Sequence, residues 1–78
     1  MKRNISTFVG ARIREYRKRS RLTQKELGEK VGVKHNTISS YENGTNEAEQ
    51  EILFSIAEVL NVSVNDFFHS FYFLLYMI

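Results

Sequence analysis

The sequence predicts an all-α fold: a compact five-helix bundle with a helix-turn-helix formed by its second and third helices, followed by an apolar C-terminal tail. Apolar residues recur at helical spacing in several stretches. The chain has no proline to interrupt them, and glycine or asparagine follows where a stretch ends. Its 78 residues suffice for one small domain, which we place at residues 1–70, with the tail at residues 71–78.

The helix-turn-helix is predicted from two short amphipathic stretches on either side of a glycine. Thr23 and Glu26 have the spacing of a capping box, in which each side chain bonds a free backbone N–H near the start of a helix. Gly32 and Gly44 each follow a stretch, at the position where a left-handed turn favours glycine. Two short helices across a small turn are typical of this motif. They are predicted at residues 24–31 and 35–42.

A further helix is predicted before the motif, at residues 7–19. Ser6 or Thr7 is the expected cap, because a hydroxyl oxygen can accept a bond from a free N–H of the first turn. Its apolar residues recur at the spacing of one helical face. This buried stripe consists of Val9, Ile13 and Tyr16.

Two helices are predicted after the motif. The first spans residues 47–60, with Asn46 as its cap and Glu49 as the capping-box partner. Ser63 and Asp66 have the same spacing and predict the start of a fifth helix. The residues that this fifth helix should direct inward are Val64, Phe67 and Phe68.

The charges are divided between the two halves of the chain. All eleven Lys and Arg lie at or before Lys34, so residues 1–35 carry eleven positive and three negative charges, a net charge of +8. Residues 36–78 have six acids and no Lys or Arg, a net charge of −6. This asymmetry indicates a polyanion-binding surface in the first half, with a generic solvated basic helix as the alternative.

Several classes of protein are not expected. Without cysteine there is no disulfide or thiolate metal site, and an intracellular, reducing compartment is the natural interpretation. His35 and His69 are the only histidines, and no paired carboxylates, Gly-rich phosphate loop or metal-spaced cluster accompanies them. We therefore expect no enzyme, no cofactor, no metal and no small-molecule ligand. The N-terminus lacks a secretory pattern, and the apolar run 71–78 is far shorter than the roughly 20 residues of a spanning helix. A cytoplasmic protein without membrane contact is expected.

Three segments together resemble the lambda-repressor-like helix-turn-helix family, also called the Xre or Cro/C1 type. They read LTQKELGEKVGV, TISSYENG and ILFSIAEVLNVSVNDFF, and the resemblance covers about Phe8 to Phe68. It implies a five-helix bundle and a transcriptional regulator of phage or bacterial type that binds a palindromic operator as a homodimer. The ending NVSVNDFF looks like the DNA-binding part of phage-type repressors. With ten residues after Phe68, the self-cleaving domain that follows in many of those proteins is not expected.

The resemblance implies that the second helix of the motif reads base edges in the major groove. Asparagine can pair with adenine and lysine with guanine, while serine can pair with the edges of several bases. Lysine is also a poor helix cap, so the N–H groups at the start of this helix are expected to be free. Solvent-exposed polar residues without a DNA role are the alternative. The candidates for base reading are Lys34, His35, Asn36, Ser39 and Ser40.

Phosphate contacts are expected at both ends of the motif. Gln24 matches the position with which the family clamps a phosphate, and the next candidates are Thr23, Asn43, Thr45 and Asn46. By the family pattern, Arg17 should reach Glu42 and form a structural ion pair. Supplementary electrostatic contributors are Arg14, Arg21 and Lys25.

The tail FYFLLYMI has no polar face, which makes it an aggregation hazard if it is left free. It is interpreted as a helix packed against a second copy, as a strand paired across a dimer, or as a by-product of truncation folded back on the core. We favour dimerisation, because a symmetric operator requires a two-fold dimer. The residues expected at the dimer contact are Phe71, Leu74, Leu75 and Ile78. The alternative function is an antitoxin-type or other protein-interaction module that binds a partner protein through the C-terminal half.

Overall fold

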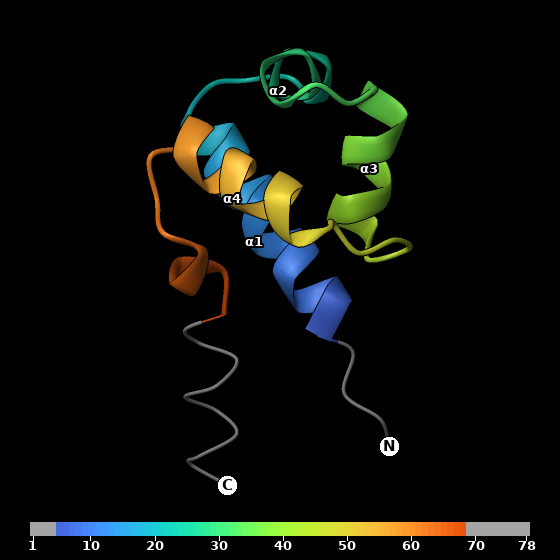
Figure 1. Ribbon diagram of the computed structural model, residues 1–78, viewed down its shortest axis with the longest axis vertical. Helices are drawn as coiled ribbons and strands as arrows, with labels where there is room; N and C mark the ends of the chain where they lie inside the picture. Colours follow the sequence, from blue (N-terminus) through green and yellow to red (C-terminus); the bar gives the residue numbers. More distant parts are fainter. Residues whose placement is uncertain (1–4, 69–78) are drawn as a thin grey trace, which may run out of the picture.

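The computed structural model describes residues 5–68, and within that range every regular element is a helix, as predicted. Helix α3 packs against both α1 and α2, and α2 also packs against α4. In Figure 1, α2 lies across the upper end of the molecule and α3 runs down its right-hand side. The helices are α1 (Ile5–Arg19), α2 (Gln24–Val31), α3 (His35–Asn43) and α4 (Gln50–Val59), followed by a helical segment at residues 64–68.

Helix α2 begins and ends where its local sequence predicts. The Thr23 hydroxyl accepts a bond from the Glu26 N–H at 3.0 Å, and the Glu26 carboxylate accepts one from the Thr23 N–H at 2.8 Å. The capping box is therefore complete. At the other end Gly32 is left-handed, with φ 84°, and its N–H bonds back to the Gly28 carbonyl.

Helix α3 has an open start and a closed end. Lys34 occupies its cap position without any side-chain hydrogen bond to the helix. Gly44 is left-handed, with φ 76°, and its N–H bonds to the carbonyls of Ser40 and Tyr41. The helix includes Asn43, one residue beyond the predicted end, because the chain reverses only at Gly44.

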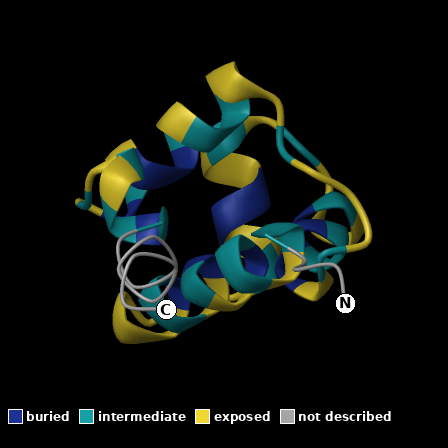
Figure 2. Cartoon of the chain, turned by 90° about the horizontal axis from the view of Figure 1, so that it is seen from below, coloured by how far each residue is buried: buried dark blue, intermediate teal, exposed yellow. Residues whose placement is uncertain are grey.

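The core lies where the inner faces of all the helices meet, and Figure 2 shows the buried residues on those inward faces. Helical periodicity brings apolar residues from each element to this centre. Burial also raises the pKa of the Tyr41 phenol, and the nearby charge of Glu49 raises it further. No helix within residues 5–68 is long and apolar enough to cross a membrane. The fully buried side chains are Ile13, Leu27, Ile38, Ile56 and Phe67.

Gly10 sets how closely α1 approaches the end of α3. It is buried, and a Cβ atom placed on it would lie 2.1 Å from the backbone oxygen of Tyr41 and 2.7 Å from that of Glu42. Only a residue without a side chain fits at this distance. The sequence does not single out this glycine, because the contact lies about thirty residues further along the chain.

The predicted start of α1 is wrong. The helix begins at Ile5, so Ser6 and Thr7 lie inside its first turn and neither is the cap. The Ser6 hydroxyl donates instead to the Glu47 carboxylate, in the loop before α4. A tertiary contact thus uses the group that local reasoning assigned to the helix end.

The predicted start of α4 is also wrong. The helix begins at Gln50, and Glu49 occupies its cap position without a side-chain hydrogen bond. Asn46 lies three residues before this cap position, and its N–H donates to the Ser40 carbonyl at 3.3 Å in the turn that closes α3. Ala48, between this turn and α4, packs against the core.

The connection after α4 follows the prediction. Asn61 is left-handed, with φ 58°, and turns the chain. The Asp66 carboxylate accepts from the Ser63 N–H at 2.8 Å, and the Ser63 hydroxyl accepts from the Asp66 N–H at 3.3 Å. This capping box starts the helical segment 64–68, which brings Phe67 into the core with no exposed surface.

Candidate nucleic-acid interface

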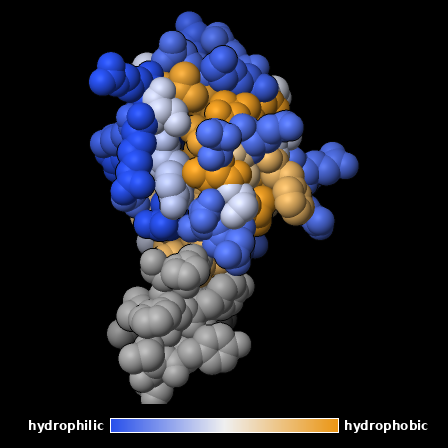
Figure 3. Space-filling model, turned by 90° about the vertical axis from the view of Figure 1, so that its left-hand side faces the viewer, coloured by the Kyte–Doolittle hydropathy of each residue, from blue (hydrophilic) through white to orange (hydrophobic). Residues whose placement is uncertain are grey.

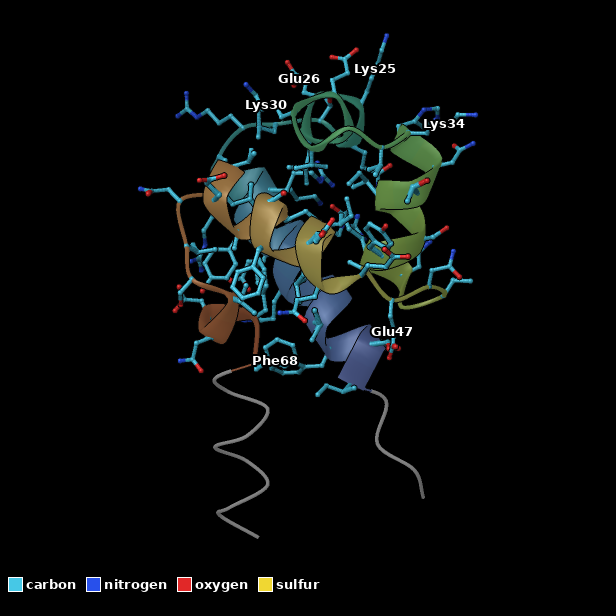
Figure 4. The ribbon with its side chains drawn as sticks, in the orientation of Figure 1. Lys25, Glu26, Lys30, Lys34, Glu47 and Phe68 are labelled. Carbon is cyan, nitrogen blue, oxygen red and sulfur yellow. The ribbon has the colours of Figure 1, made fainter. Side chains whose placement is uncertain are left out.

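The N-terminal end of α3 presents polar side chains to solvent. Lys34, His35 and Asn36 are exposed, and Figure 4 shows Lys34 extending away from the body of the molecule. Ile38 and Tyr41 are buried on the opposite side of the helix. The buried side fixes the rotation of α3 about its axis, so the polar side necessarily faces outward.

Ser39 and Ser40 are half-buried and lie further along α3. The Ser40 hydroxyl donates to the backbone carbonyl of Asn36 at 3.1 Å. Its proton is therefore used within the helix, and what it offers outward in this conformation is an acceptor lone pair.

The start of α3 also offers backbone donors. The Lys34 side chain makes no hydrogen bond to the helix, although its carbonyl accepts from the N–H groups of Thr37 at 3.0 Å and Ile38 at 3.2 Å. The N–H groups that precede Thr37 have no carbonyl of the helix to bond. The positive end of the helix dipole lies at the same place. Together with the Lys34 ammonium group, these N–H groups give this end of α3 a local preference for anions or base acceptors.

The residues expected to contact phosphates occupy two places. Thr23 and Gln24 lie at the start of α2, where the Thr23 hydroxyl accepts the capping bond from the Glu26 N–H. The remaining three are exposed in and after the last turn of α3. They are Asn43, Thr45 and Asn46.

The two places are joined by Glu42. Its Oε1 atom accepts a hydrogen bond from Gln24 Nε2 at 3.0 Å, so the start of α2 lies beside the end of α3. Arg17 of α1 reaches the same carboxylate, with Nε 2.6 Å from Oε2 and Nη2 3.0 Å from Oε1. Arg17 and Glu42 are 8% and 6% exposed, so this ion pair is interior. The bond to Gln24 was not expected from the sequence, and no local pattern signals a contact across 18 residues.

Exposed cations lie on α1, on α2 and in the turn between them. Arg14, Arg21 and Lys25 are exposed, and Arg21 is left-handed with φ 60° at the end of α1. Figure 4 shows Lys25 and Lys30 on the outer side of α2. Figure 3 shows hydrophilic residues over this upper end of the molecule, with hydrophobic residues gathered lower on the same face.

Two further arginines are used in packing. Arg12 and Arg19 both lie over the Tyr16 ring, with guanidinium carbons 5.1 and 5.4 Å from its centre, and both contact Glu15. Arg12 also bonds the Asp66 carbonyl at 3.3 Å and so ties α1 to the segment 64–68. Part of the positive charge of α1 is thus neutralised where α1 contacts the segment 64–68.

The residues predicted for dimerisation lie outside the described part of the chain. They are Phe71, Leu74, Leu75 and Ile78.

Two short helices across a glycine turn, with the second exposing a polar N-terminal end, define a helix-turn-helix protein. Residues 13–67 match the model of a family described as helix-turn-helix. An uncharacterized HTH-type transcriptional regulator of Sinorhizobium medicae is 41% identical over 64 residues, which cover 82% of this chain and 46% of that protein. The chain belongs to the helix-turn-helix family, of the Xre or Cro/C1 type.

Two other relatives extend the comparison. Antitoxin PezA of Streptococcus pneumoniae is 40% identical over 59 residues, covering 76% of this chain and 37% of the antitoxin. The P22 c2 repressor, solved in complex with synthetic operator 9T, has a TM-score of 0.73 at 34% identity, over 76% of this chain and 89% of the repressor chain. The chain spans less than half the length of the Sinorhizobium and Streptococcus proteins.

Proposed function

We propose that this chain is a double-stranded DNA-binding transcriptional regulator that acts in the cytoplasm and reads the major groove with α3. The observation that carries the proposal is the outward-facing polar end formed by Lys34, His35 and Asn36, held in place by the buried opposite face of the helix. The similarity to P22 c2 repressor, a protein solved on an operator, supports it.

The proposal assigns sequence reading and phosphate binding to different side chains. Asn36 can bond adenine through both the oxygen and the NH₂ group of its side-chain amide, and Lys34 can bond guanine O6 and N7. Gln24 at the start of α2 and the exposed loop after α3 would bind phosphates on either side of the groove, which fixes position without reading sequence. The +8 charge of residues 1–35 would bring the polyanion to this half of the chain.

We further propose a homodimer on a palindromic operator, acting as a repressor. One α3 reads one half-site, and a two-fold dimer places two such helices about 34–36 Å apart. The apolar tail 71–78 is the segment that we assign to the contact between copies.

Selection from a random pool of DNA duplexes tests this function. Enrichment of inverted half-sites whose centres are about 10–10.5 base pairs apart is the expected result. Absence of any enriched sequence at low salt would contradict the proposal. Enrichment of a single, unrepeated half-site would contradict the homodimer alone.

A second candidate function has one observation in its favour, the similarity to antitoxin PezA. In this alternative the C-terminal half, with six acids and the apolar tail, binds a partner protein. The salt dependence of DNA binding separates the two functions. A DNA-binding protein loses affinity steeply as salt rises, because its cations release counterions from the duplex. A chain that binds only a protein partner shows no specific duplex binding at any salt.

A further inference from the structure

The Glu42 carboxylate has three donors around it. Oε2 accepts from Arg17 Nε at 2.6 Å, and Oε1 accepts from both Arg17 Nη2 and Gln24 Nε2 at 3.0 Å. Arg17 also donates through Nη1 to the carbonyl of Leu22 at 2.7 Å, just before the Thr23 cap. The start of α2 is thus held at the end of α3 by one buried carboxylate, that of Glu42, and one buried guanidinium, that of Arg17.

We propose that Glu42 is a positioning residue for phosphate binding: it fixes the Gln24 amide in the one orientation that presents a free N–H to the DNA backbone. The inference rests on the proposed function, because it concerns how Gln24 would bind a phosphate. It goes beyond that function by giving a role in DNA affinity to a buried residue that does not touch DNA.

The orientation follows from the chemistry of the two groups. An ionised carboxylate only accepts hydrogen bonds, whereas an amide has a donor side and an acceptor side. Turning the Gln24 amide by half a turn would place its oxygen against Glu42 Oε1, and two acceptors repel. The bonded orientation leaves the second Nε2 proton for an outside acceptor. Phosphate oxygens are acceptors, so a neutral amide held this way is matched to them.

Pre-orientation should also strengthen binding. Gln24 is half-buried, and a long side chain loses rotamer freedom when it binds a ligand. The bond to Glu42 restricts that freedom before DNA arrives. Arg17 balances the negative charge of Glu42, so the carboxylate can lie near a phosphate without a net repulsion.

A double-mutant cycle on full-length protein tests the inference, with operator affinity as the readout. The variants are Gln24→Ala, Glu42→Gln and the two combined, compared at a temperature where circular dichroism shows all of them folded. Glu42→Gln keeps the size of the side chain but introduces an N–H that favours the flipped Gln24 amide. We expect each single change to weaken operator binding about tenfold or more, as for a hydrogen bond to a charged group. The double variant should bind the operator no more weakly than the single variants do, because both changes remove the same interaction.

The exposed Glu58→Gln substitution is the matched control. Removing any acid should by itself strengthen binding to a polyanion slightly. If Glu42→Gln weakens operator binding and Glu58→Gln does not, the effect of Glu42→Gln therefore has the opposite sign to that of removing a negative charge. If Glu42 had only a structural role, Glu42→Gln would lower the free energy of unfolding, and Gln24→Ala would still weaken operator binding by its full amount in the Glu42→Gln background. That additive result overturns the inference.

Side-chain NMR of the unsubstituted protein decides the matter if Glu42→Gln does not fold. One Gln24 Nε2 proton should exchange slowly in the free protein, and the other should shift when duplex is added. Two equally fast-exchanging protons in the free protein would overturn the inference. Binding of operator with additive losses overturns this inference alone, whereas the absence of any duplex binding by the unsubstituted chain overturns the proposed function as well.

Discussion

Arg17 and Glu42, 25 residues apart in the sequence, form two hydrogen bonds in the interior, at 2.6 and 3.0 Å. The pair joins the last turns of α1 to the end of α3 and leaves almost no exposed surface on either side chain. It therefore fixes the position of α3 relative to the rest of the fold. A buried pair of this kind is costly to break, because the remaining partner is left as an uncompensated charge.

Replacing Glu42 with Ala should lower the free energy of unfolding by about 3–5 kcal/mol, since Arg17 would remain buried without its partner. Replacing both residues, Arg17→Met with Glu42→Leu, should cost markedly less, because no charge is then buried. Urea denaturation of the three proteins measures both effects. A loss below about 1 kcal/mol for Glu42→Ala would contradict this prediction, because the pair would then contribute no more to stability than an exposed surface ion pair.

Gly10→Ala should destabilise the protein, although alanine in place of glycine inside a helix normally stabilises by about 1 kcal/mol. The added Cβ would meet the carbonyl oxygen of Tyr41 at 2.1 Å, so α1 and α3 would have to move apart. We expect a loss of about 1–3 kcal/mol, as for an overpacked core. Thermal unfolding followed by circular dichroism gives the sign. A melting temperature above that of the unsubstituted protein would show that the contact is loose.

The capping box of α2 should weaken in acid. The bonds from the Thr23 backbone and hydroxyl groups lower the pKa of Glu26. A lowered folded pKa means that the stabilisation is fully present above the ordinary value of 4.5 and is lost as the pH falls through the folded value. Glu26→Gln keeps an oxygen acceptor but does not titrate. Between pH 6 and pH 3 the unsubstituted protein should therefore lose more stability in urea unfolding than this variant, and equal losses would contradict the prediction.

Removing the tail should separate the two copies. A chain that ends at His69 lacks the apolar residues that we assign to the dimer contact, and it should sediment as a monomer at concentrations where the full chain is a dimer. Equal dimer content for both chains would refute this assignment. The residues removed include Phe71, Leu74, Leu75 and Ile78.

The sequence predicts those parts of the fold whose signals are local. α2 has its predicted bounds because Thr23, Glu26 and Gly32 act on their own neighbours. At the mispredicted starts of α1 and α4, residues that the sequence offers as caps make other contacts. Ser6 bonds Glu47, and the backbone of Asn46 is taken up by the turn after α3. Local propensity has no information about either contact.

In the candidate site, too, some features follow from the local sequence and others only from the packing of the helices. The exposure of Lys34, His35 and Asn36 follows from the helical positions of buried neighbours, which the sequence gives directly. The bond between Gln24 and Glu42 requires the packed arrangement of three helices, and no spacing rule predicts it.

Titration of the selected operator with the Asn36→Ala variant is the decisive test of base reading by α3. The unsubstituted protein and Asn65→Ala, which removes an exposed asparagine outside the motif, serve as controls. The Ser40 hydroxyl bonds the Asn36 backbone, so the substitution leaves that contact available. If α3 reads bases, Asn36→Ala should weaken operator binding by about 1–3 kcal/mol, roughly 5- to 150-fold, while binding to random duplex at the same salt stays unchanged. Equal losses on operator and random DNA, or no loss on either, would contradict base reading by α3.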